Sequence, residues 1–322
     1  MSAYRVLAPA KVNLGLFVGP PREHDGRHEL ATVMQSISLA DELTLGPAPA
    51  GAERDELVCP GVPSLEEENL AAVALRAFRA RTGWDAPPQR LTIRKRIPVA
   101  AGLGGGSADA AGALRLAGHA SGLRDRGVLY ELARELGADV PAQVSPGRWL
   151  ASGAGEELSE LQPPAGSLGV LVLASEGQLS TAAVYRRADT LGIAREPAEL
   201  KQRLLALRAA LAGEEPLPDD AELLVNDLQP AALDLLPQIA SALEEARAAG
   251  AAHALVSGSG PTVIGLFGGG HGTDEDGFAL ARSAAQRLHR RVPAAYAARP
   301  VGAAFARVVR HNPAEMANRG SA

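Results

Sequence analysis

A glycine-rich segment, Gly102-Leu-Gly-Gly-Gly-Ser107, contains the residues that point most directly to chemistry. It lies between a predicted strand over 91–97 and a predicted helix over 107–120. Glycines let a backbone approach an anion closely and adopt positive φ. The free N–H groups and the dipole of a following helix then favour a phosphate group. The segment therefore predicts a phosphate-binding loop, with a glycine-rich turn that binds nothing as the alternative.

Two common phosphate-binding motifs do not match this segment. The Walker A pattern G-x-x-x-x-G-K-[ST] does not occur in the sequence. The dinucleotide fingerprint G-x-G-x-x-G fits from Gly102, except that Ser107 replaces its third glycine. The acidic residue expected about 20 positions further on would be Asp125, which lies in a polar loop. An NAD-dependent oxidoreductase is therefore the weakest of the open alternatives.

Lysine is rare in this chain, which makes single lysines informative. The 32 basic residues are 29 arginines and three lysines, Lys11, Lys95 and Lys201. A lysine that persists in such a composition is expected where a compact ammonium is needed rather than a planar fork. For Lys201, in an ordinary predicted helix, chance is the preferred explanation. The histidines have no metal-like spacing, and the single cysteine, Cys59, excludes a disulfide framework and a Cys-rich metal site.

The elements that must position these residues follow from the apolar periodicity. Two short strands, over 4–9 and 12–18, are predicted around a break at Ala8-Pro9-Ala10. Further strands are predicted over 30–45, 168–174, 252–256 and 262–267, and further helices over 69–81, 128–136, 181–191, 197–212, 230–249 and 275–291. Because strands and helices mix without strict alternation, the pattern favours an α+β fold.

Length and composition limit the classes of function. A chain of 322 residues suggests two domains, and Pro163-Pro164 before a new strand places a boundary near residue 160. A net charge of −5 does not favour nucleic-acid binding. No apolar run reaches the roughly 18 residues of a membrane span, and no signal peptide is visible. We expect a cytoplasmic small-molecule enzyme, monomeric or homodimeric, with no nucleic-acid or membrane partner.

Three ordered segments resemble the three motifs of the GHMP kinases, the group of galactokinase, homoserine kinase, mevalonate kinase and phosphomevalonate kinase. They are Pro9-Ala-Lys-Val-Asn-Leu14, Pro98-Val-Ala-Ala-Gly-Leu-Gly-Gly-Gly-Ser-Ala-Asp109 and Val256-Ser-Gly-Ser-Gly-Pro-Thr262. More narrowly, three other segments are similar to the cytidine-recognising members of this family, which act in the non-mevalonate isoprenoid pathway: Asp25-Gly-x-His28, Glu68-Asn-Leu70 and Gly137-Ala-Asp-Val-Pro141. The resemblance spans residues 5–305.

The resemblance implies an α+β, two-domain GHMP kinase fold with the active site in the cleft between the domains. The first domain would be ribosomal protein S5 domain 2-like and the second ferredoxin-like α/β. The expected ranges are 1–160 for the ATP-binding domain, 161–309 for the second domain and 310–322 for a flexible tail. The implied reaction uses ATP and Mg²⁺ to phosphorylate the 2-hydroxyl of 4-diphosphocytidyl-2-C-methyl-D-erythritol.

The same resemblance assigns catalytic and nucleotide-binding roles. Asp139 is the expected base for the acceptor hydroxyl, and Lys11 the ammonium that stabilises the developing negative charge. Ser107 is the hydroxyl expected near the phosphates and, indirectly, Mg²⁺. The other residues expected around ATP are Asn69, Lys95, Pro98, Val99, Ala100, Ala101, Gly102, Leu103, Gly104, Gly105, Gly106 and Ala108. The alternatives are a turn residue for Asp139, a solvated strand lysine for Lys11, a surface residue for Lys95 and a residue of a helix start for Asn69.

Six residues are expected on the substrate side: Asn13, Arg27, His28, Tyr185, Gly258 and Ser259. A neutral imidazole both donates and accepts, which suits the cytosine edge for His28. Tyr185 falls where the family often stacks an aromatic ring on that base. Structural roles stay open: a backbone-bonding turn residue for Asn13, a structural histidine for His28, a core tyrosine for Tyr185 and, at 258–259, a tight turn between strands.

The sequence departs from the family at two positions on the expected substrate side. Where the family usually has Asp-Gly-Tyr-His, this chain has Arg27, and where a bulky aromatic residue follows Asp-Val-Pro, it has Ala142. A guanidinium plane can also stack on a base. A divergent GHMP kinase for another polyol or nucleotide-linked alcohol, and a non-catalytic nucleotide-binding relative, therefore remain alternatives.

Overall fold

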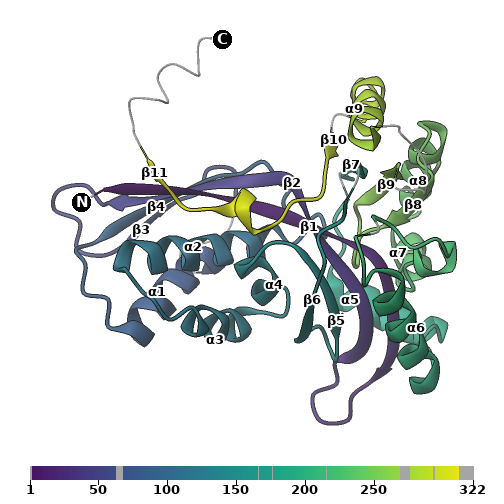
Figure 1. Ribbon diagram of the computed structural model, residues 1–322, viewed down its shortest axis with the longest axis horizontal. Coiled ribbons are helices and arrows are strands. Elements are labelled where there is room, and N and C mark those ends of the chain that lie inside the picture. The colour runs from purple at the N-terminus through teal and green to yellow at the C-terminus, as the bar shows by residue number, and fades with distance from the viewer. Residues whose placement is uncertain are drawn as a thin grey trace.

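Two long antiparallel strands, β1 (Ala3–Pro21) and β2 (His28–Pro47), form the spine of the structure, a computed structural model (Figure 1). It describes residues 2–311 except 63–67, 166, 176, 215, 269–275 and 293. The predicted break at Pro9 does not split the first strand, because the irregularity is a register shift between Pro9 and Lys11. Proline has no N–H for the ladder, and a bulge accommodates it within one strand.

The larger sheet carries the glycine loop. In the described part of the chain it has seven strands in the order β11-β1-β2-β4-β3, with β5 paired to β2 and β6 to β5. Its other strands are β3 (Glu56–Val58), β4 (Gln89–Arg94), β5 (Arg148–Ser152), β6 (Glu157–Leu161) and β11 (Val309–His311). Four helices lie on one side of this sheet (Figure 1): α1 (Leu70–Thr82), α2 (Gly105–Ser121), α3 (Gly127–Leu136) and α4 (Val140–Val144).

A buried apolar cluster joins these helices to the sheet. The central helix α2 is rich in alanine and glycine, so its backbone packs closely against α1 and β1. At Gly112 a Cβ would lie 2.9 Å from Leu43 Cδ2, so a larger residue there would require the Leu43 side chain to move. The helix that follows the glycine loop is therefore closely packed on the sheet.

The smaller sheet has four antiparallel strands in the order β10-β7-β9-β8 among the described residues. These are β7 (Gly169–Leu173), β8 (His253–Val256), β9 (Val263–Phe267) and β10 (Ala295–Ala298). The accompanying helices are α5 (Thr181–Leu191), α6 (Pro197–Ala210), the 3-10 turn η2 (Ala221–Leu223), α7 (Gln229–Leu235), α8 (Ile239–Ala248), α9 (Gly277–Leu288) and the 3-10 turn η3 (Ala303–Ala306). The expected α+β class is confirmed.

Three expected boundaries change. The helix predicted over 230–249 is two helices, because Pro237 cannot donate a helical hydrogen bond. The strand predicted over 91–97 ends at Arg94, since the N–H groups of Arg96 and Ile97 donate to the Asp41 carboxylate instead. Arg310 and His311, expected in the flexible tail, pair with the start of β1, and residues 312–322 of that tail lie outside the described residues.

Within the described segments, no helix is both long enough and apolar enough to cross a membrane.

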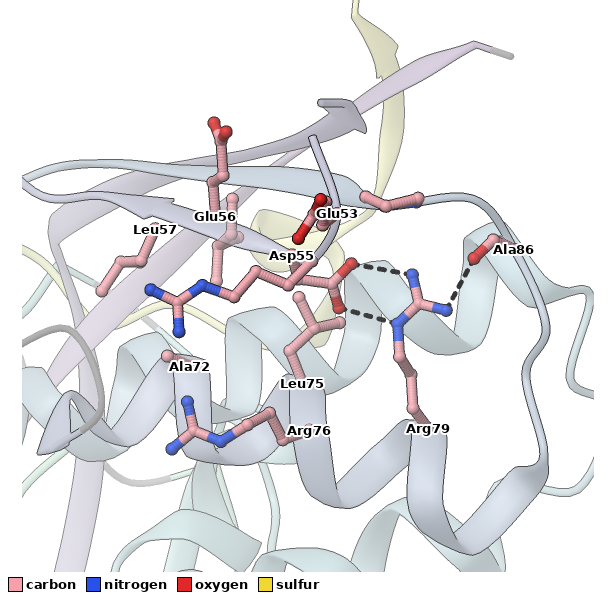
Figure 2. A pocket seen from close by; sticks show the side chains of 12 residues that line it. Glu53, Asp55, Glu56, Leu57, Ala72, Leu75, Arg76, Arg79 and Ala86 are labelled. Carbon is pink, nitrogen blue, oxygen red and sulfur yellow. Dashed lines mark hydrogen bonds and ion pairs between the residues drawn. The ribbon is translucent and has the colours of Figure 1, made fainter. Parts of the chain in front are cut away.

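A cavity of about 580 Å³ lies between α1 and the β3–β4 edge (Figure 2). On one side of it, Arg79 donates to both oxygens of Asp55, at 2.7 and 2.8 Å. The same guanidinium donates to the carbonyls of Trp84 and Ala86, and Asp55 also accepts the N–H of Gln89. This bidentate pair joins α1 to the strand edge.

Replacing Arg79 with alanine should lower the free energy of unfolding by about 2 kcal/mol, because Asp55 and two carbonyls lose a charged donor. Arg81→Ala on the same helix is the matched control. Arg81 pairs with the exposed Glu131 and Glu135, and such exposed pairs contribute less than about 1 kcal/mol. Urea unfolding of both variants measures the difference, and equal losses would contradict the account.

Candidate active site

Two cavities meet at the glycine loop. The larger, of about 850 Å³, is lined by β1, β2, α5 and the 258–259 turn and is called the cleft. The smaller, of about 350 Å³, is lined by residues 98–107 with Asn69 and Lys95 and is called the loop pocket. Gly102, Gly104 and Ser107 border both cavities. These three residues therefore form a common border between the two cavities.

The loop needs glycine at two positions for steric reasons. Gly102 and Gly104 have φ values of +75° and +68°. A Cβ on Gly102 would lie 2.5 Å from the carbonyl oxygen of Gly260, and one on Gly104 would lie 3.0 Å from Lys11 Cγ. Gly104 is also the N-cap of α2, so the first N–H groups of this 17-residue helix have no capping side chain. Ser107 lies in the first turn of this helix.

Lys11 and Asp139 come together at the base of the cleft. Lys11 follows the bulge in β1, and Asp139 directly precedes α4. The Lys11 Nζ atom lies 3.4 Å from Asp139 Oδ2 and donates to Asn13 Oδ1 at 3.0 Å. Lys11 is only 8% exposed, whereas the Asp139 side chain is 37% exposed and reachable from the cleft. This geometry excludes a solvated strand lysine.

Hydrogen bonds within β1 and β2 fix the orientation of Asn13. Its Nδ2 donates to Thr32 Oγ1 at 2.8 Å, and the Thr32 hydroxyl donates to the carbonyl of Gly15. The Asn13 oxygen therefore faces Lys11 and its amide nitrogen faces away. The Asn13 side chain therefore lines the cleft in a fixed orientation.

The 258–259 turn packs directly on the lysine. A Cβ on Gly258 would lie 3.4 Å from Asn13 Oδ1 and 3.7 Å from Lys11 Nζ, and the Ser259 hydroxyl lies 3.0 Å from Thr181 Oγ1. Both turn residues line the cleft. The structure thus places Gly258 beside Lys11 and Ser259 beside Thr181 at the cleft wall.

Asn226 anchors this turn, and sequence reasoning did not find it. Its Nδ2 donates to the carbonyls of Val256 and Gly258, both at 2.7 Å, while its Oδ1 accepts the N–H of Leu228. The backbone on either side of Asn226 also pairs with β1. The N–H of Leu16 donates to the carbonyl of Val225, and the N–H of Asp227 donates to the carbonyl of Leu16. The signal available was the scarcity of asparagine, which occurs five times in the sequence.

At the other end of the cleft, His28 and Tyr185 face each other. Their ring centroids are 5.0 Å apart with planes inclined by 36°. His28 Nε2 lies 2.7 Å from Oδ1 of Asp189, an α5 residue that sequence reasoning also missed. Burial, and then the Asp139 charge, raise the pKa of Tyr185 to about 12, so the phenol stays neutral. Tyr185 is at the cleft wall, not in the apolar core alone.

Arg27 also lines the cleft, with its side chain 48% exposed. It donates to the carbonyl of Ala154 at 2.7 Å. The turn before it is held by Arg22, which contacts both Asp25 and Glu156 and lowers the pKa of Asp25 to about 2. The second departure, Ala142, packs behind the wall.

The neighbours of Ala142 include a large aromatic side chain. Ala142 is buried in one cluster with Met34 and Trp149, and Ala142 does not border the cleft. Trp149 therefore supplies aromatic bulk beside the position where the family has it. Arg27 is the departure that faces a ligand.

The loop pocket holds a paired lysine. Lys95 Nζ lies 2.5 Å from Asp41 Oδ2 and 2.7 Å from Asp109 Oδ2, so it is not a surface residue of a basic strand. Burial raises the pKa of Asp109 to about 7, although the positive charge of Lys95 acts in the opposite direction. Asp109 Oδ1 has no hydrogen-bond partner among the described residues. Asn69 lines the pocket and also caps α1 by accepting the N–H of Ala71 at 3.0 Å.

The comparisons with known proteins agree with this geometry. The family model for the GHMP kinases N terminal domain matches residues 69–147, and that for the GHMP kinases C terminal domain matches residues 203–298. The chain is 44% identical over 298 residues to 4-diphosphocytidyl-2-C-methyl-D-erythritol kinase of Streptomyces avermitilis, covering 89% of this chain and 96% of the relative. It is 41% identical over 268 residues to the protein of that name from an Anaeromyxobacter strain, with 82% of each covered.

Solved structures give the same picture. A crystal structure of 4-(cytidine 5'-diphospho)-2C-methyl-D-erythritol kinase is 35% identical, with a TM-score of 0.72 over 92% of this chain and 100% of that one. A homoserine kinase from Cytophaga hutchinsonii has a TM-score of 0.71 over 96% of this chain and 98% of that one, at 17% identity. The latter shows similarity of fold alone.

Replacing Asn226 should loosen the turn beside Lys11. Asn226→Asp keeps the acceptor for Leu228 but cannot donate to the two carbonyls, so we expect about 2 kcal/mol lower stability and an altered turn. The size is measured by urea unfolding, and the turn by the chemical shifts of Gly258 and Ser259. Shifts and stability like those of the unmodified chain would contradict the anchoring role.

The Asp109 carboxyl should make stability depend on pH. Its folded-state pKa of about 7 lies above its ordinary value of 3.8, so between these values the folded chain holds more protons than the unfolded chain. This group's contribution therefore lowers the free energy of unfolding as pH rises from about 4 to about 7, and stays level above that. Asp109→Asn should lose less stability between about pH 5 and about pH 8 than the unmodified chain in urea unfolding; an equal loss would contradict the assignment.

Proposed function

The chain belongs to the GHMP kinase family, and we propose that it transfers the γ-phosphoryl group of ATP to the 2-hydroxyl of 4-diphosphocytidyl-2-C-methyl-D-erythritol. Relatives and a solved structure of that activity match most of the chain at 35–44% identity. A kinase needs a phosphate donor and an acceptor alcohol side by side. The paired cavities offer such an arrangement.

The observation that carries the proposal is the Lys11–Asp139 pair in the cleft, where Lys11 lies against Gly104, a residue that borders both cavities. Binding a nucleotide alone requires no carboxylate beside the position of its terminal phosphate. A carboxylate held 3.4 Å from a buried ammonium, and open to the cleft, suits proton transfer from an alcohol. The pair therefore favours a kinase over a non-catalytic nucleotide-binding relative.

Asp139 acts as the base in this proposal. As the acceptor oxygen attacks the γ-phosphorus, its proton passes to the Asp139 carboxylate and ADP leaves. Lys11 stays charged beside both groups and stabilises the negative charge that develops on the oxygens. Positioning and charge stabilisation supply most of the catalysis in phosphoryl transfer, so a rigid Lys11 matters more than a strong base.

The glycine loop holds the phosphates in this proposal. The uncapped N–H groups at the start of α2 suit an anion, and Gly106 has no atom within 4 Å of a Cβ position, which leaves room over the helix start. Asn69 lines the same pocket as these glycines. Lys95 forms ion pairs with Asp41 and Asp109, and these ion pairs shape the pocket wall.

Mg²⁺ fits the site as a partner of the nucleotide. Within the described segments, no three His, Cys, Asp or Glu side chains are grouped to hold a metal ion. Mg²⁺ usually keeps several waters and binds substrate phosphates with one or two protein oxygens. We assign Ser107, at the border of both cavities, as a neighbouring oxygen. When bound, the ion neutralises phosphate charge.

The cytidine end of the substrate would lie against His28 and Tyr185, which line the same end of the cleft. The neutral Tyr185 ring offers a stacking surface, and the base edge would meet the imidazole. Arg27, which replaces the usual tyrosine, has half its side chain free in the cleft to stack or to contact a phosphate oxygen. Because this substitution faces the cleft, a kinase for another nucleotide-linked alcohol is the second candidate.

Asp139→Asn should lower kcat by about 10²- to 10⁴-fold with KM values little changed, because the amide keeps the shape but takes no proton. The measurement is ADP release with ATP, Mg²⁺ and 4-diphosphocytidyl-2-C-methyl-D-erythritol. Asp85→Asn, at an exposed position outside both cavities, is the matched control and should retain full activity.

Unchanged turnover in Asp139→Asn would contradict its role as base. If the unmodified chain turns over no cytidyl substrate but phosphorylates another nucleotide-linked alcohol, the second candidate replaces the first.

A further inference from the structure

One face of α5 closes the base-binding end of the cleft. Ala182, Tyr185 and Asp189 all line it, at spacings of three and four residues that place them on the same side of the helix. Tyr185 and Asp189 both contact His28, one by its ring and the other by its carboxylate. The helix thus holds the imidazole from two directions.

The carboxylate determines which ring nitrogen carries the proton. His28 Nε2 lies 2.7 Å from Asp189 Oδ1. An ionised carboxylate only accepts hydrogen bonds, so Nε2 must be the donor. In a neutral imidazole the other nitrogen, Nδ1, then carries a lone pair and is an acceptor. A carboxylate partner commonly fixes a histidine tautomer in this way.

The acceptor nitrogen remains available to a ligand. His28 lines the cleft, its side chain is 8% exposed, and Nδ1 has no hydrogen-bond partner within the described segments. The charged groups that share this end of the cleft are Arg27 and Arg186, with Asp139 farther along the wall. Neither arginine contacts the imidazole by a hydrogen bond in the described structure, so Asp189 alone sets its tautomer.

We propose that Asp189 is a positioning residue that sets His28 to read an N–H donor on the base of the substrate. This inference rests on the proposed function. Cytosine presents an exocyclic amine at the position where uracil presents a carbonyl oxygen. An acceptor at Nδ1 bonds the amine and repels the carbonyl, so the Asp189–His28 pair selects cytidine over uridine.

The cost of a mismatch follows from the burial of the ring. A buried acceptor that meets another acceptor loses its hydrogen bond and keeps its desolvation cost. We expect the unmodified chain to bind cytidine 5'-diphosphate at least about 10-fold more tightly than uridine 5'-diphosphate. Without Asp189 the imidazole can rotate or take the other tautomer, and this preference should fall to within about threefold.

The test compares Asp189→Ala and Asp189→Asn with the unmodified chain by calorimetric titration of the two nucleoside diphosphates. Asp189→Asn keeps an oxygen that can accept from Nε2 and should restore part of the preference. Asp234→Ala is the matched control. The exposed Asp234 pairs with Arg187, which is an α5 residue like Asp189, and this pair lies away from the cleft. It should leave the preference unchanged.

A second readout reports the tautomer directly. In ¹⁵N spectra of the His28 side chain, the unmodified chain should carry its proton on Nε2, and Asp189→Ala should shift the population towards Nδ1. The affinity for ATP should stay the same in every variant. A variant that fails to fold would lose ATP binding as well.

Two outcomes separate this inference from the proposed function. Cytidine preference that survives intact in Asp189→Ala, or a proton on Nδ1 in the unmodified chain, overturns the role of Asp189 alone. If the unmodified chain binds neither diphosphate, the proposed function fails and this assignment fails with it.

Discussion

A buried ammonium group on β1 is the contact on which the rest of this structure depends. Lys11 is 8% exposed, and a charge in such a place needs close partners to offset the loss of hydration. Its Nζ has Asn13 and Asp139, its backbone N–H bonds the carbonyl of Leu103, and its stem touches Gly104. One residue thereby joins the central strands, the glycine loop and the base of the cleft.

The glycines follow from this arrangement. A side chain on Gly104 would press on the lysine stem, and one on Gly102 would press on the 258–260 turn. The loop and the turn therefore approach each other backbone to backbone, and Asn226 holds the turn in place from the other side. These close contacts form the common border of the two cavities.

The division of labour between lysine and arginine explains much of the remaining electrostatics. Lys11 and Lys95 each place one compact ammonium between two side-chain oxygens, as the rarity of lysine suggested, while Lys201 is exposed. The buried Arg115 instead spreads its donors over backbone carbonyls, those of Ala306, Leu7 and Ala111. A planar fork suits several separated acceptors, whereas a point charge suits a narrow gap between carboxylates.

Sequence reasoning succeeded where the signal was local. The glycines before α2, the Asn69 start of α1 and the 181–191 helix all lie within about two residues of their expected places, because caps and apolar periodicity act over short stretches. It also identified Lys11 and Asp139 through their motifs, although only the fold could bring them together. The α+β class followed from the mixed order of elements.

What the sequence could not reveal was long-range pairing. Asp189 meets His28 across 161 positions, and Asp41 ends β4 by accepting N–H groups 55 and 56 positions away. The long first strand was missed for a related reason: Pro9 breaks a local pattern, but the partner strand β2 continues past it and accommodates a bulge. Such contacts depend on the register of strands and helices that no single stretch of sequence specifies.

The central claim is that the acceptor alcohol lies between Asp139 and the phosphate end of the loop pocket. A crystal structure with a non-hydrolysable ATP analogue, Mg²⁺ and the cytidyl substrate tests it most directly. The account predicts the 2-hydroxyl within hydrogen-bond distance of the Asp139 carboxylate, facing the γ-phosphate beside Ser107. A hydroxyl that points away from Asp139, or a triphosphate that binds outside the loop pocket, would contradict it.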